Sequence, residues 1–460
     1  MCGITAILYN EEKDGLEIYE SLLSIQHRGQ DGSGIYNLSN NTIDGIKKKG
    51  LINNLCSYED LKSMKSKIYL GHTRYKTNNV YNSFQPFHLR SKKFNMIFCH
   101  NGNIINTTEI AIILEQEFDV QLDGNHSDSF LLFNLIFSYI NCNFFEEIDS
   151  TLIVKLSNFL HDNILGSFSI VLGIENYGLV VIKDKFGIRP LTFGINEKKD
   201  ILVSSESCSV NNLPRFKIKR DIKPGETMVF LNNKETISFQ YRHSFLSPCL
   251  FEYIYFSRLD SVLNNISVYQ CRHLLGELMG KTILKENLKV DFIIPTPETS
   301  RVYAYGLSSY TKIPIQECII KNRYVNRTFI TENKDKIEED IRRKFSVISE
   351  IVKDKTAILV DDSIVRGNTS KNIIKLLKDS GIKKVIFYSA APKIYNTNNY
   401  GIYIENKEEL ITFENKTDVG IANAIGADKI YYNSLDDVCS VINHLNPAIG
   451  DMELSMFVDN

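Results

Sequence analysis

The sequence has 460 residues, a formal net charge of −2 and a hydrophobic fraction of 43%. A chain of this length exceeds one ordinary hydrophobic core, so we expect two domains. The basic residues are scattered along a nearly neutral chain, which argues against nucleic acid as a partner. No run of about 18 apolar residues is present and no signal-peptide pattern opens the chain, so no membrane partner is expected. Nine cysteines without CxxC pairs fit a reducing compartment, and we expect a cytoplasmic protein.

The chain opens with MCGITAILYN, in which Cys2 is the second residue. Methionine is normally removed before a small second residue, and Cys2 would then carry both a thiol and a free α-amino group. That amino group has an unperturbed pKa of about 8, so it can serve as the base for its own thiol. A lone cysteine is more often a buried structural residue, and the case for a nucleophile therefore depends on later segments.

Three later segments carry side chains suited to an amide substrate. Arg74, in GHTRYKT, has a planar guanidinium that can meet a carboxylate with two hydrogen bonds. In FCHNGNI a strand runs into a tight turn, where Asn101 offers an amide and Gly102 an N–H without a Cβ, an arrangement able to hold an oxyanion. In HSDSFLLFNLI a helix begins, with Ser127 or Asp128 at its cap.

Short strands alternate with turn residues in the rest of this half. They are SFSIVLG, GLVVIKD, PLTFGI, ILVSSES and ETMVFL. This pattern predicts two antiparallel sheets that end at about residue 235, followed by a connection through LNNKETISFQYRH.

Thr356 to Leu377 has the pattern of a strand, a loop and a helix. The apolar run 357–360 is typical of a buried parallel strand and ends at Asp361 and Asp362. Small and hydroxylic residues at 367–370 let backbone N–H groups converge on an anion, in front of the N-terminal dipole of the helix. We therefore predict a phosphate site, with the two carboxylates on vicinal hydroxyls or Mg²⁺. An ordinary strand-loop-helix with Asp361 as helix cap would explain neither the second carboxylate nor the glycine and hydroxyl run.

Two further segments of this half suit a polyanion. DFIIPTPETSR is a strand followed by a loop with the hydroxyls of Thr296, Thr299 and Ser300 and the guanidinium of Arg301, for which a solvated turn is the alternative. IIKNRYVNRTFI, at 319–330, gathers three cations, and the polar stretch after it favours a lid that an anion orders. The cations of this segment are Lys321, Arg323 and Arg327, with Arg342 and Lys344 beyond it.

These motifs carry a resemblance to a known family. VDDSIVRGNTS resembles the phosphoribosyl pyrophosphate (PRPP) loop of type I phosphoribosyltransferases, although Asn368 stands where threonine is usual. MCGI, QHRGQDGSG, GHTRYKT, FCHNGNI and HSDSFLLFNLI resemble segments of class II glutamine amidotransferases. Together they resemble the amidophosphoribosyltransferase family over nearly the whole chain. IIKNRYVNRTFI also resembles that family's lid motif, with Asn326 in place of glycine.

The resemblance implies a fold with two domains of α/β and α+β type. It implies an αββα Ntn-hydrolase sandwich over 2–235, a Rossmann-like parallel-sheet phosphoribosyltransferase domain over 236–445 and a C-terminal tail over 446–460. The implied reaction converts glutamine, water and PRPP to 5-phosphoribosylamine, glutamate and pyrophosphate, the first committed step of purine synthesis.

The resemblance also implies roles for particular residues. The implied roles are Cys2 as nucleophile; Asn101 and Gly102 as oxyanion donors; Arg28, Arg74 and Asp128 as glutamine ligands; Ser300, Asp361 and Asp362 as metal ligands; and Asp361, Asp362, Ser363, Arg366, Gly367, Asn368, Thr369, Ser370, Lys321, Arg323 and Arg327 as PRPP ligands.

The implied cofactor is Mg²⁺, and the implied partners are glutamine, PRPP, purine nucleotide inhibitors and further copies of the chain in a dimer or tetramer. Some family members bind a [4Fe–4S] cluster through four cysteines. Cys249 stands where the first would fall, but Asn398 occupies the apparent second position and the final cysteine pair is missing, so no cluster is expected. A glucosamine-phosphate or asparagine synthase would share MCGI and HNGN but would not explain VDDSIVRG. An inactive scaffold protein would require a damaged nucleophile or PRPP loop, and both are intact.

Overall fold

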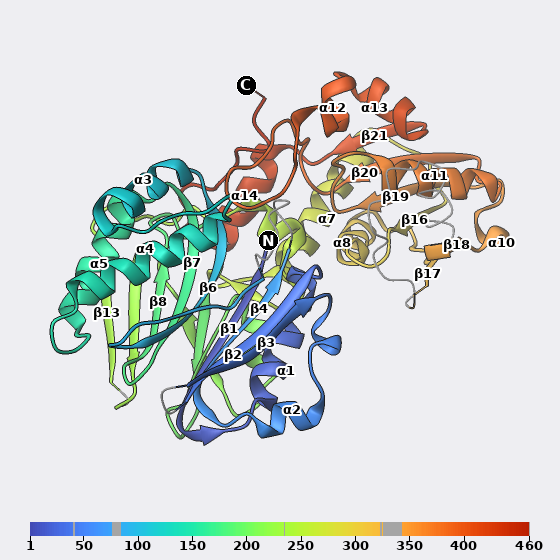
Figure 1. Cartoon of the computed structure of the whole chain (residues 1–460). Coiled ribbons are helices and arrows are strands. Elements are labelled where there is room, and N and C mark those ends of the chain that lie inside the picture. The colour runs from blue at the N-terminus through green and yellow to red at the C-terminus, as the bar shows by residue number, and fades with distance from the viewer. Residues whose placement is uncertain (40–41, 76–83, 234, 323, 325–342, 460) are drawn as a thin grey trace.

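The computed structural model describes residues 1–39, 42–75, 84–233, 235–322, 324 and 343–459. Figure 1 shows two units, an N-terminal one in blue and green and a C-terminal one in yellow to red, that meet near the N-terminus of the chain. None of the helices in these ranges is long and apolar enough to span a membrane.

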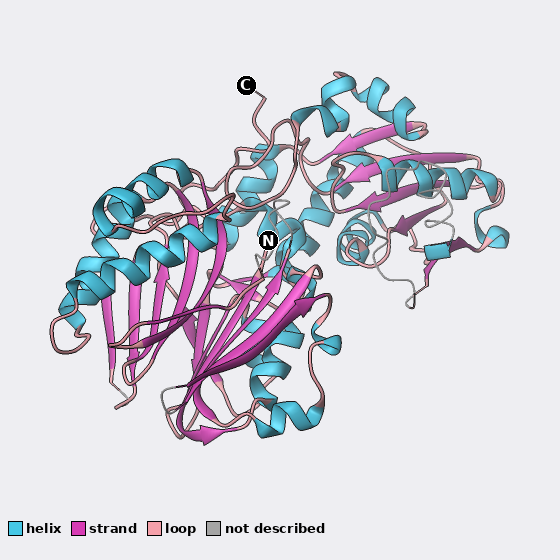
Figure 2. Cartoon of the chain, viewed as in Figure 1, coloured by secondary structure: helices cyan, strands magenta, loops and turns pink. Residues whose placement is uncertain are grey.

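Two antiparallel sheets stack in the first unit (Figure 2). One sheet has the order β11-β9-β10-β1-β4-β2-β3 and the other the order β13-β12-β8-β7-β6-β5. The strands are β1 (Gly3–Lys13), β2 (Gly32–Ser39), β3 (Thr42–Lys49), β4 (Ser66–Arg74), β5 (Phe87–Arg90), β6 (Asn95–Ile104), β7 (Gly166–Ile174), β8 (Gly178–Lys183), β9 (Thr192–Ile195), β10 (Ile201–Ser204), β11 (Lys217–Asp221), β12 (Glu226–Leu231) and β13 (Thr236–Gln240).

Helices cover both outer faces of this pair of sheets. The first sheet packs on α1 (Leu16–Ser24), α2 (Tyr58–Ser63) and α6 (Ser207–Asn211), and the second on α3 (Thr107–Phe118), α4 (Asp128–Asn143) and α5 (Ser150–Asn163). Alternate strand residues such as Leu70, Cys99 and Val171 fill the space between the sheets, because successive side chains of a strand point to opposite faces. The predicted αββα sandwich is therefore confirmed.

The first unit extends further along the chain than predicted. The segment expected to be a connection forms β13, which pairs with β12 from Glu226 with Gln240 to Phe230 with Thr236. The sheet thus continues to Gln240, and the predicted boundary at 235 falls in the turn between its last two strands.

The second unit is built on a parallel sheet in the order β16-β19-β20-β21, as predicted. Ile358 and Val360 of the central strand β19 pack toward α7 and α8, whereas Ala357 and Leu359 pack toward α11 and α13. The elements are β16 (Phe292–Pro295), β19 (Thr356–Asp361), β20 (Lys384–Ser389), β21 (Lys429–Tyr432), α7 (Val268–Lys285), α8 (Arg301–Thr311), α11 (Asn368–Asp379), α13 (Asp418–Ile425) and α14 (Leu435–Leu445), with the small pieces β14 (Val262–Leu263), β15 (Ile266–Ser267), β17 (Ile319–Lys321), β18 (Phe345–Val347), α10 (Ser349–Val352) and α12 (Ile411–Glu414).

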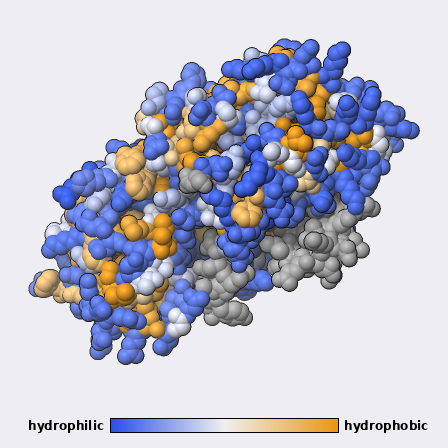
Figure 3. All heavy atoms as spheres, turned by 90° about the horizontal axis from the view of Figure 1, so that it is seen from above, coloured by the Kyte–Doolittle hydropathy of each residue, from blue (hydrophilic) through white to orange (hydrophobic). Residues whose placement is uncertain are grey.

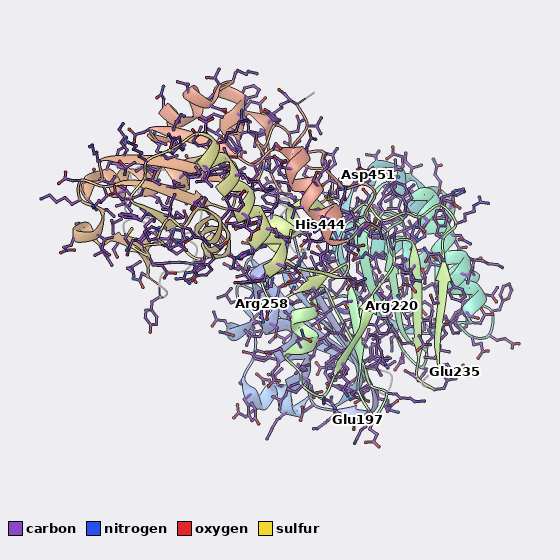
Figure 4. The ribbon with its side chains drawn as sticks, turned by 180° about the vertical axis from the view of Figure 1, so that it is seen from behind. Glu197, Arg220, Glu235, Arg258, His444 and Asp451 are labelled. Carbon is purple, nitrogen blue, oxygen red and sulfur yellow. The ribbon has the colours of Figure 1, made fainter. Side chains whose placement is uncertain are left out.

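The predicted C-terminal tail is part of this second core. Ile449, Met452, Met456 and Phe457 are buried in the same cluster as Ile358. Seen from behind in Figure 4, His444 at the end of α14 and Asp451 in the tail lie near the junction of the two units.

On the face shown in Figure 3, exposed hydrophobic side chains are scattered among hydrophilic ones.

Candidate active sites

Cys2 lies where β1, β4 and β6 come together. Its backbone N–H donates to Asn101 Oδ1 over 3.1 Å, and its Sγ lies 3.9 Å from the carbonyl oxygen of Tyr75, just after β4. Met1 is buried, with 2% of its surface exposed, and burial lowers the pKa of its α-amino group to about 4. While Met1 is present, the nitrogen of Cys2 is an amide and cannot act as the predicted base.

The two predicted oxyanion donors stand beside Cys2. The Oδ1 atom of Asn101 is occupied by Cys2, and its Nδ2 atom is buried without an acceptor among the described residues. A buried amide donor without a partner costs about 1–3 kcal/mol, which a bound acceptor would recover. The predicted turn is wrong, because Asn101 and Gly102 lie within β6 and pair with Ser169 and Phe168 of β7. At Gly102 a Cβ would lie 2.0 Å from the carbonyl oxygen of Ser167, so only glycine fits this position of the strand.

Arg74 and Asp128 offer opposite charges near the same cysteine. Burial lowers the pKa of Arg74, while the negative charges of Cys2, Asp31 and Asp128 oppose this shift. The guanidinium of Arg74 also stacks over Phe84, 5.3 Å from the ring centroid. A cation and a carboxylate in this arrangement complement the α-carboxylate and α-ammonium of an amino acid.

The helix-cap alternative for Asp128 is wrong. The cap of α4 is Ser127, whose side chain accepts the N–H of Phe130 over 3.2 Å. Asp128 Oδ2 instead accepts the N–H of Ile104, at the end of β6, over 3.1 Å. This bond holds the carboxylate of Asp128 at the end of β6, the strand that carries Asn101.

The predicted contact of Arg28 with glutamine is wrong. Its side chain is fully buried, and its Nε donates to the Cys2 carbonyl oxygen over 3.0 Å. Its Nη1 donates to Glu206 over 2.6 Å, and its Nη2 donates to Glu252 over 2.7 Å. Each nitrogen of the guanidinium therefore already has a protein acceptor, so Arg28 positions the backbone of Cys2 instead of binding a ligand.

The second site lies at the carboxyl end of β19, where Asp361 and Asp362 are buried. Ser300 donates to Asp361 over 3.1 Å, Ser363 donates to Asp362 over 2.7 Å, and Thr299 also donates to Asp362. Burial and the neighbouring charge of Asp362 raise the pKa of Asp361, and burial raises the pKa of Asp362. Two carboxylates held this way are suited to a ligand that compensates their charge.

The helix-cap alternative for Asp361 is also wrong, because the cap of α11 is Gly367. Gly367 has a φ of +77°, and a Cβ there would lie 2.5 Å from Ile411 Cδ1, which together require glycine. Among the described residues no side chain caps the helix, so the first-turn N–H groups at Asn368 and Thr369 stay open for an anion. Ser370, in the same turn, is buried.

Two arginines predicted to face phosphate are engaged in ion pairs on the surface. Arg301 pairs with Glu298 and with Glu317, over 2.9 Å in both cases, and Arg366 pairs with Glu409. Exposed pairs of this kind contribute about 1 kcal/mol or less, so a polyphosphate can compete with the carboxylates for these cations.

The remaining predicted ligands divide into described and undescribed positions. Thr296 follows β16, and its Oγ1 is buried without a partner among the described residues, as expected of a hydroxyl that serves a ligand. Lys321 ends β17 and is partly exposed, and Lys344 Nζ lies 5.5 Å from the ring centroid of Phe345. The predicted lid residues Arg323, Arg327 and Arg342, with Asn326, lie outside the described residues.

The positions compared with cluster cysteines lie close together. Cys249 is buried and its backbone bridges to Glu453, whose carboxylate accepts from Asn398 Nδ2 over 2.9 Å. The hydrogen-bonded pair Asn398–Glu453 therefore stands beside Cys249, the cysteine at the first cluster position. The expected absence of an iron–sulfur cluster stays a prediction.

Comparisons with known proteins agree with this division into two sites. Residues 72–212 match the Glutamine amidotransferase domain family, and residues 263–414 match the Phosphoribosyl transferase domain family. The chain is 34% identical to the amidophosphoribosyltransferase of Pasteurella multocida, covering 99% of this chain and 92% of the relative. It is 36% identical to that of Schizosaccharomyces pombe, over 95% and 86% of the two chains.

Solved structures give the same result for the fold. The glutamine PRPP amidotransferase from B. subtilis, in complex with ADP and GMP, superposes with a TM-score of 0.86 at 30% identity and covers 99% of this chain and 96% of its own.

The fold and the two sites define an enzyme that joins a glutamine amidotransferase unit to a phosphoribosyltransferase unit. The chain belongs to the amidophosphoribosyltransferase family. It is accordingly a glutamine-dependent transferase of purine biosynthesis.

Proposed function

We propose that the chain makes 5-phosphoribosylamine from glutamine and PRPP, with Cys2 as the nucleophile of the first half-reaction. The observation that carries this proposal is Asn101, whose Oδ1 accepts from Cys2 while its buried Nδ2 is left without an acceptor. Once Met1 is removed, the α-amino group of Cys2 takes the thiol proton and the thiolate attacks the glutamine amide. Asn101 and Gly102 stabilise the oxyanion, ammonia leaves, and water hydrolyses the thioester to glutamate.

In the second half-reaction ammonia attacks C1 of PRPP, a C–N bond forms, and the C–O bond to pyrophosphate breaks. The N-terminus of α11 would hold the 5-phosphate, and Thr296 and its loop would hold the pyrophosphate. Asp361 and Asp362 would bind the ribose hydroxyls.

The carboxylate and hydroxyl oxygens of the second site are the kind of ligands that Mg²⁺ binds. Asp361 accepts from Ser300, and the neighbouring Asp362 accepts from Thr299 and Ser363, so several oxygen donors line this end of β19. Burial raises the pKa of both carboxyl groups, and a bound cation would offset that cost of ionisation. When bound, Mg²⁺ would neutralise charge on the pyrophosphate leaving group.

We expect PRPP to switch on the glutaminase, although it binds in the other unit. A glutaminase that ran without acceptor would waste glutamine, and linkage requires that a glutamine analogue at Cys2 raise PRPP affinity by the same factor. Glutamate release with and without PRPP and Mg²⁺ measures this coupling, and we expect stimulation of about 5-fold or more. Equal rates in both conditions would show that the two sites work independently.

Three further expectations depend on the family resemblance. We propose that purine nucleotides inhibit the enzyme, supported by the ADP and GMP bound in the B. subtilis relative. We also propose a homo-oligomer, a dimer or a tetramer, that acts in the cytoplasm.

A further inference from the structure

A buried π-helix joins the two units. It spans Glu252–Phe256 and is followed by β14, β15 and α7, and Glu252, Tyr253 and Ile254 are all buried. π-helices are rare and occur frequently at functional sites. In Figure 4 the label of Arg258, two residues after this π-helix, marks the place where the units meet.

On the side of the first unit, the π-helix is bound to the residue that positions Cys2. Arg28 donates to both carboxylate oxygens of Glu252, over 2.7 and 3.1 Å, and the side chains of the pair are 0% and 2% exposed. The same guanidinium donates through Nε to the carbonyl oxygen of Cys2 over 3.0 Å. Ser257 adds a hydrogen bond to Glu252 over 2.9 Å, which fixes the carboxylate from the other side.

On the side of the second unit, the π-helix is bound to the segment that holds the acidic pair. Tyr303 donates its hydroxyl to the carbonyl oxygen of Ile254 over 2.7 Å, and both residues are buried. Tyr303 lies in the first turn of α8, which directly follows Thr299 and Ser300. Those two hydroxyls donate to Asp362 and Asp361, the carboxylates of the PRPP loop.

A second contact strengthens this side. Arg272 of α7 donates to the carbonyl oxygens of Tyr253 and Ser257, each over 2.8 Å, and its charge opposes the burial that raises the pKa of Asp362. The π-helix is therefore held by side chains at both of its ends and from both units.

We propose that Arg28 and Glu252 are positioning residues that couple the two active sites through this π-helix. The inference rests on the proposed function, because it explains how PRPP would activate the glutaminase. Removing the partner of a buried charge is strongly unfavourable, so a shift of Glu252 moves Arg28 with it. Arg28 then shifts the carbonyl of Cys2, while Tyr303 transmits any rearrangement of the loop at 299–300 to the π-helix.

Glu252→Gln tests the proposal because it removes the charge and keeps the shape. We expect PRPP stimulation of glutamate release to fall at least about 5-fold toward none. Ammonia-dependent transfer should stay within about 2-fold, since no contact to the PRPP loop is removed. The matched control is Glu226→Gln, which breaks the bidentate pair with Arg220, over 2.7 Å in both bonds, inside the first unit.

Tyr303→Phe removes the hydroxyl that binds the π-helix at Ile254, on the side of the second unit. This variant tests whether the π-helix couples the two sites even if Glu252→Gln does not fold. It should also reduce PRPP stimulation, and the double variant should lose less than the sum of the two single effects because both act in one connection. Full stimulation in Tyr303→Phe, or an equal loss in the Glu226→Gln control, would overturn the proposal. Absence of stimulation in the wild type would instead contradict the proposed coupling itself.

Discussion

Cys2→Ala is expected to abolish glutamine-dependent synthesis, by on the order of 1,000-fold or more, and to leave ammonia-dependent synthesis within about 2-fold. The thiol is needed only to release ammonia, whereas the PRPP site in the second unit contains no part of Cys2. Rates with glutamine, and with ammonium at raised pH where free ammonia is abundant, measure the two half-reactions separately.

A matched control for this variant is Cys142→Ala, because Cys142 is exposed and unpaired with any other cysteine among the described residues. It should retain both activities. Protein that keeps Met1 should behave like Cys2→Ala, because the nitrogen of Cys2 is then an amide. A folded Cys2→Ala protein that lost both activities would count against separate sites.

Asp361→Asn is expected to lower kcat/KM for PRPP by about 100-fold or more, because it removes a charged acceptor from the ligand site. The same change should stabilise the ligand-free protein at neutral pH. Burial and Asp362 raise the pKa of Asp361 in the folded state, so the folded protein binds protons that the unfolded chain has released. This unfavourable contribution therefore grows as pH rises above the unfolded pKa of about 4, up to the folded pKa.

Thermal unfolding between pH 5 and 8 without ligand measures the stability effect. We expect the wild type to lose more stability than Asp361→Asn as pH rises, and Asp451→Asn, which changes an exposed carboxylate in the C-terminal segment, to follow the wild type. Normal PRPP kinetics in Asp361→Asn would require a different role for Asp361.

Local patterns were sufficient to predict much of both candidate sites. The apolar run that forms β19 ends at Asp361, at the carboxyl ends of the parallel strands. Because the loop and helix follow directly in the sequence, their order alone places the two carboxylates beside the helix N-terminus. The turn predicted at Asn101 was wrong, because β6 continues through Gly102 to Ile104, but Asn101 does stand beside Cys2. Which residue caps a helix was left open, because Ser127 and Asp128 both have suitable side chains and only the contact with Ile104 separates them.

Features that depend on distant contacts could not be predicted. Arg28 and Glu252 are 224 positions apart, and nothing near either residue indicates a buried partner. β13 is a short edge strand with only two apolar residues, Ile237 and Phe239, so it resembles a polar connection. The C-terminal segment has its apolar residues in irregular backbone, where no helical or strand period reveals that they are buried.

The central claim is that one chain passes nitrogen from glutamine at Cys2 to PRPP at Asp361 and Asp362. The most direct measurement uses glutamine labelled with ¹⁵N in its amide, together with PRPP, Mg²⁺ and excess unlabelled ammonium near neutral pH. We predict equal amounts of glutamate and pyrophosphate and a product amine that carries the label almost undiluted. Release of pyrophosphate without any nitrogen donor, or a product whose nitrogen comes mainly from the unlabelled ammonium, would contradict the account.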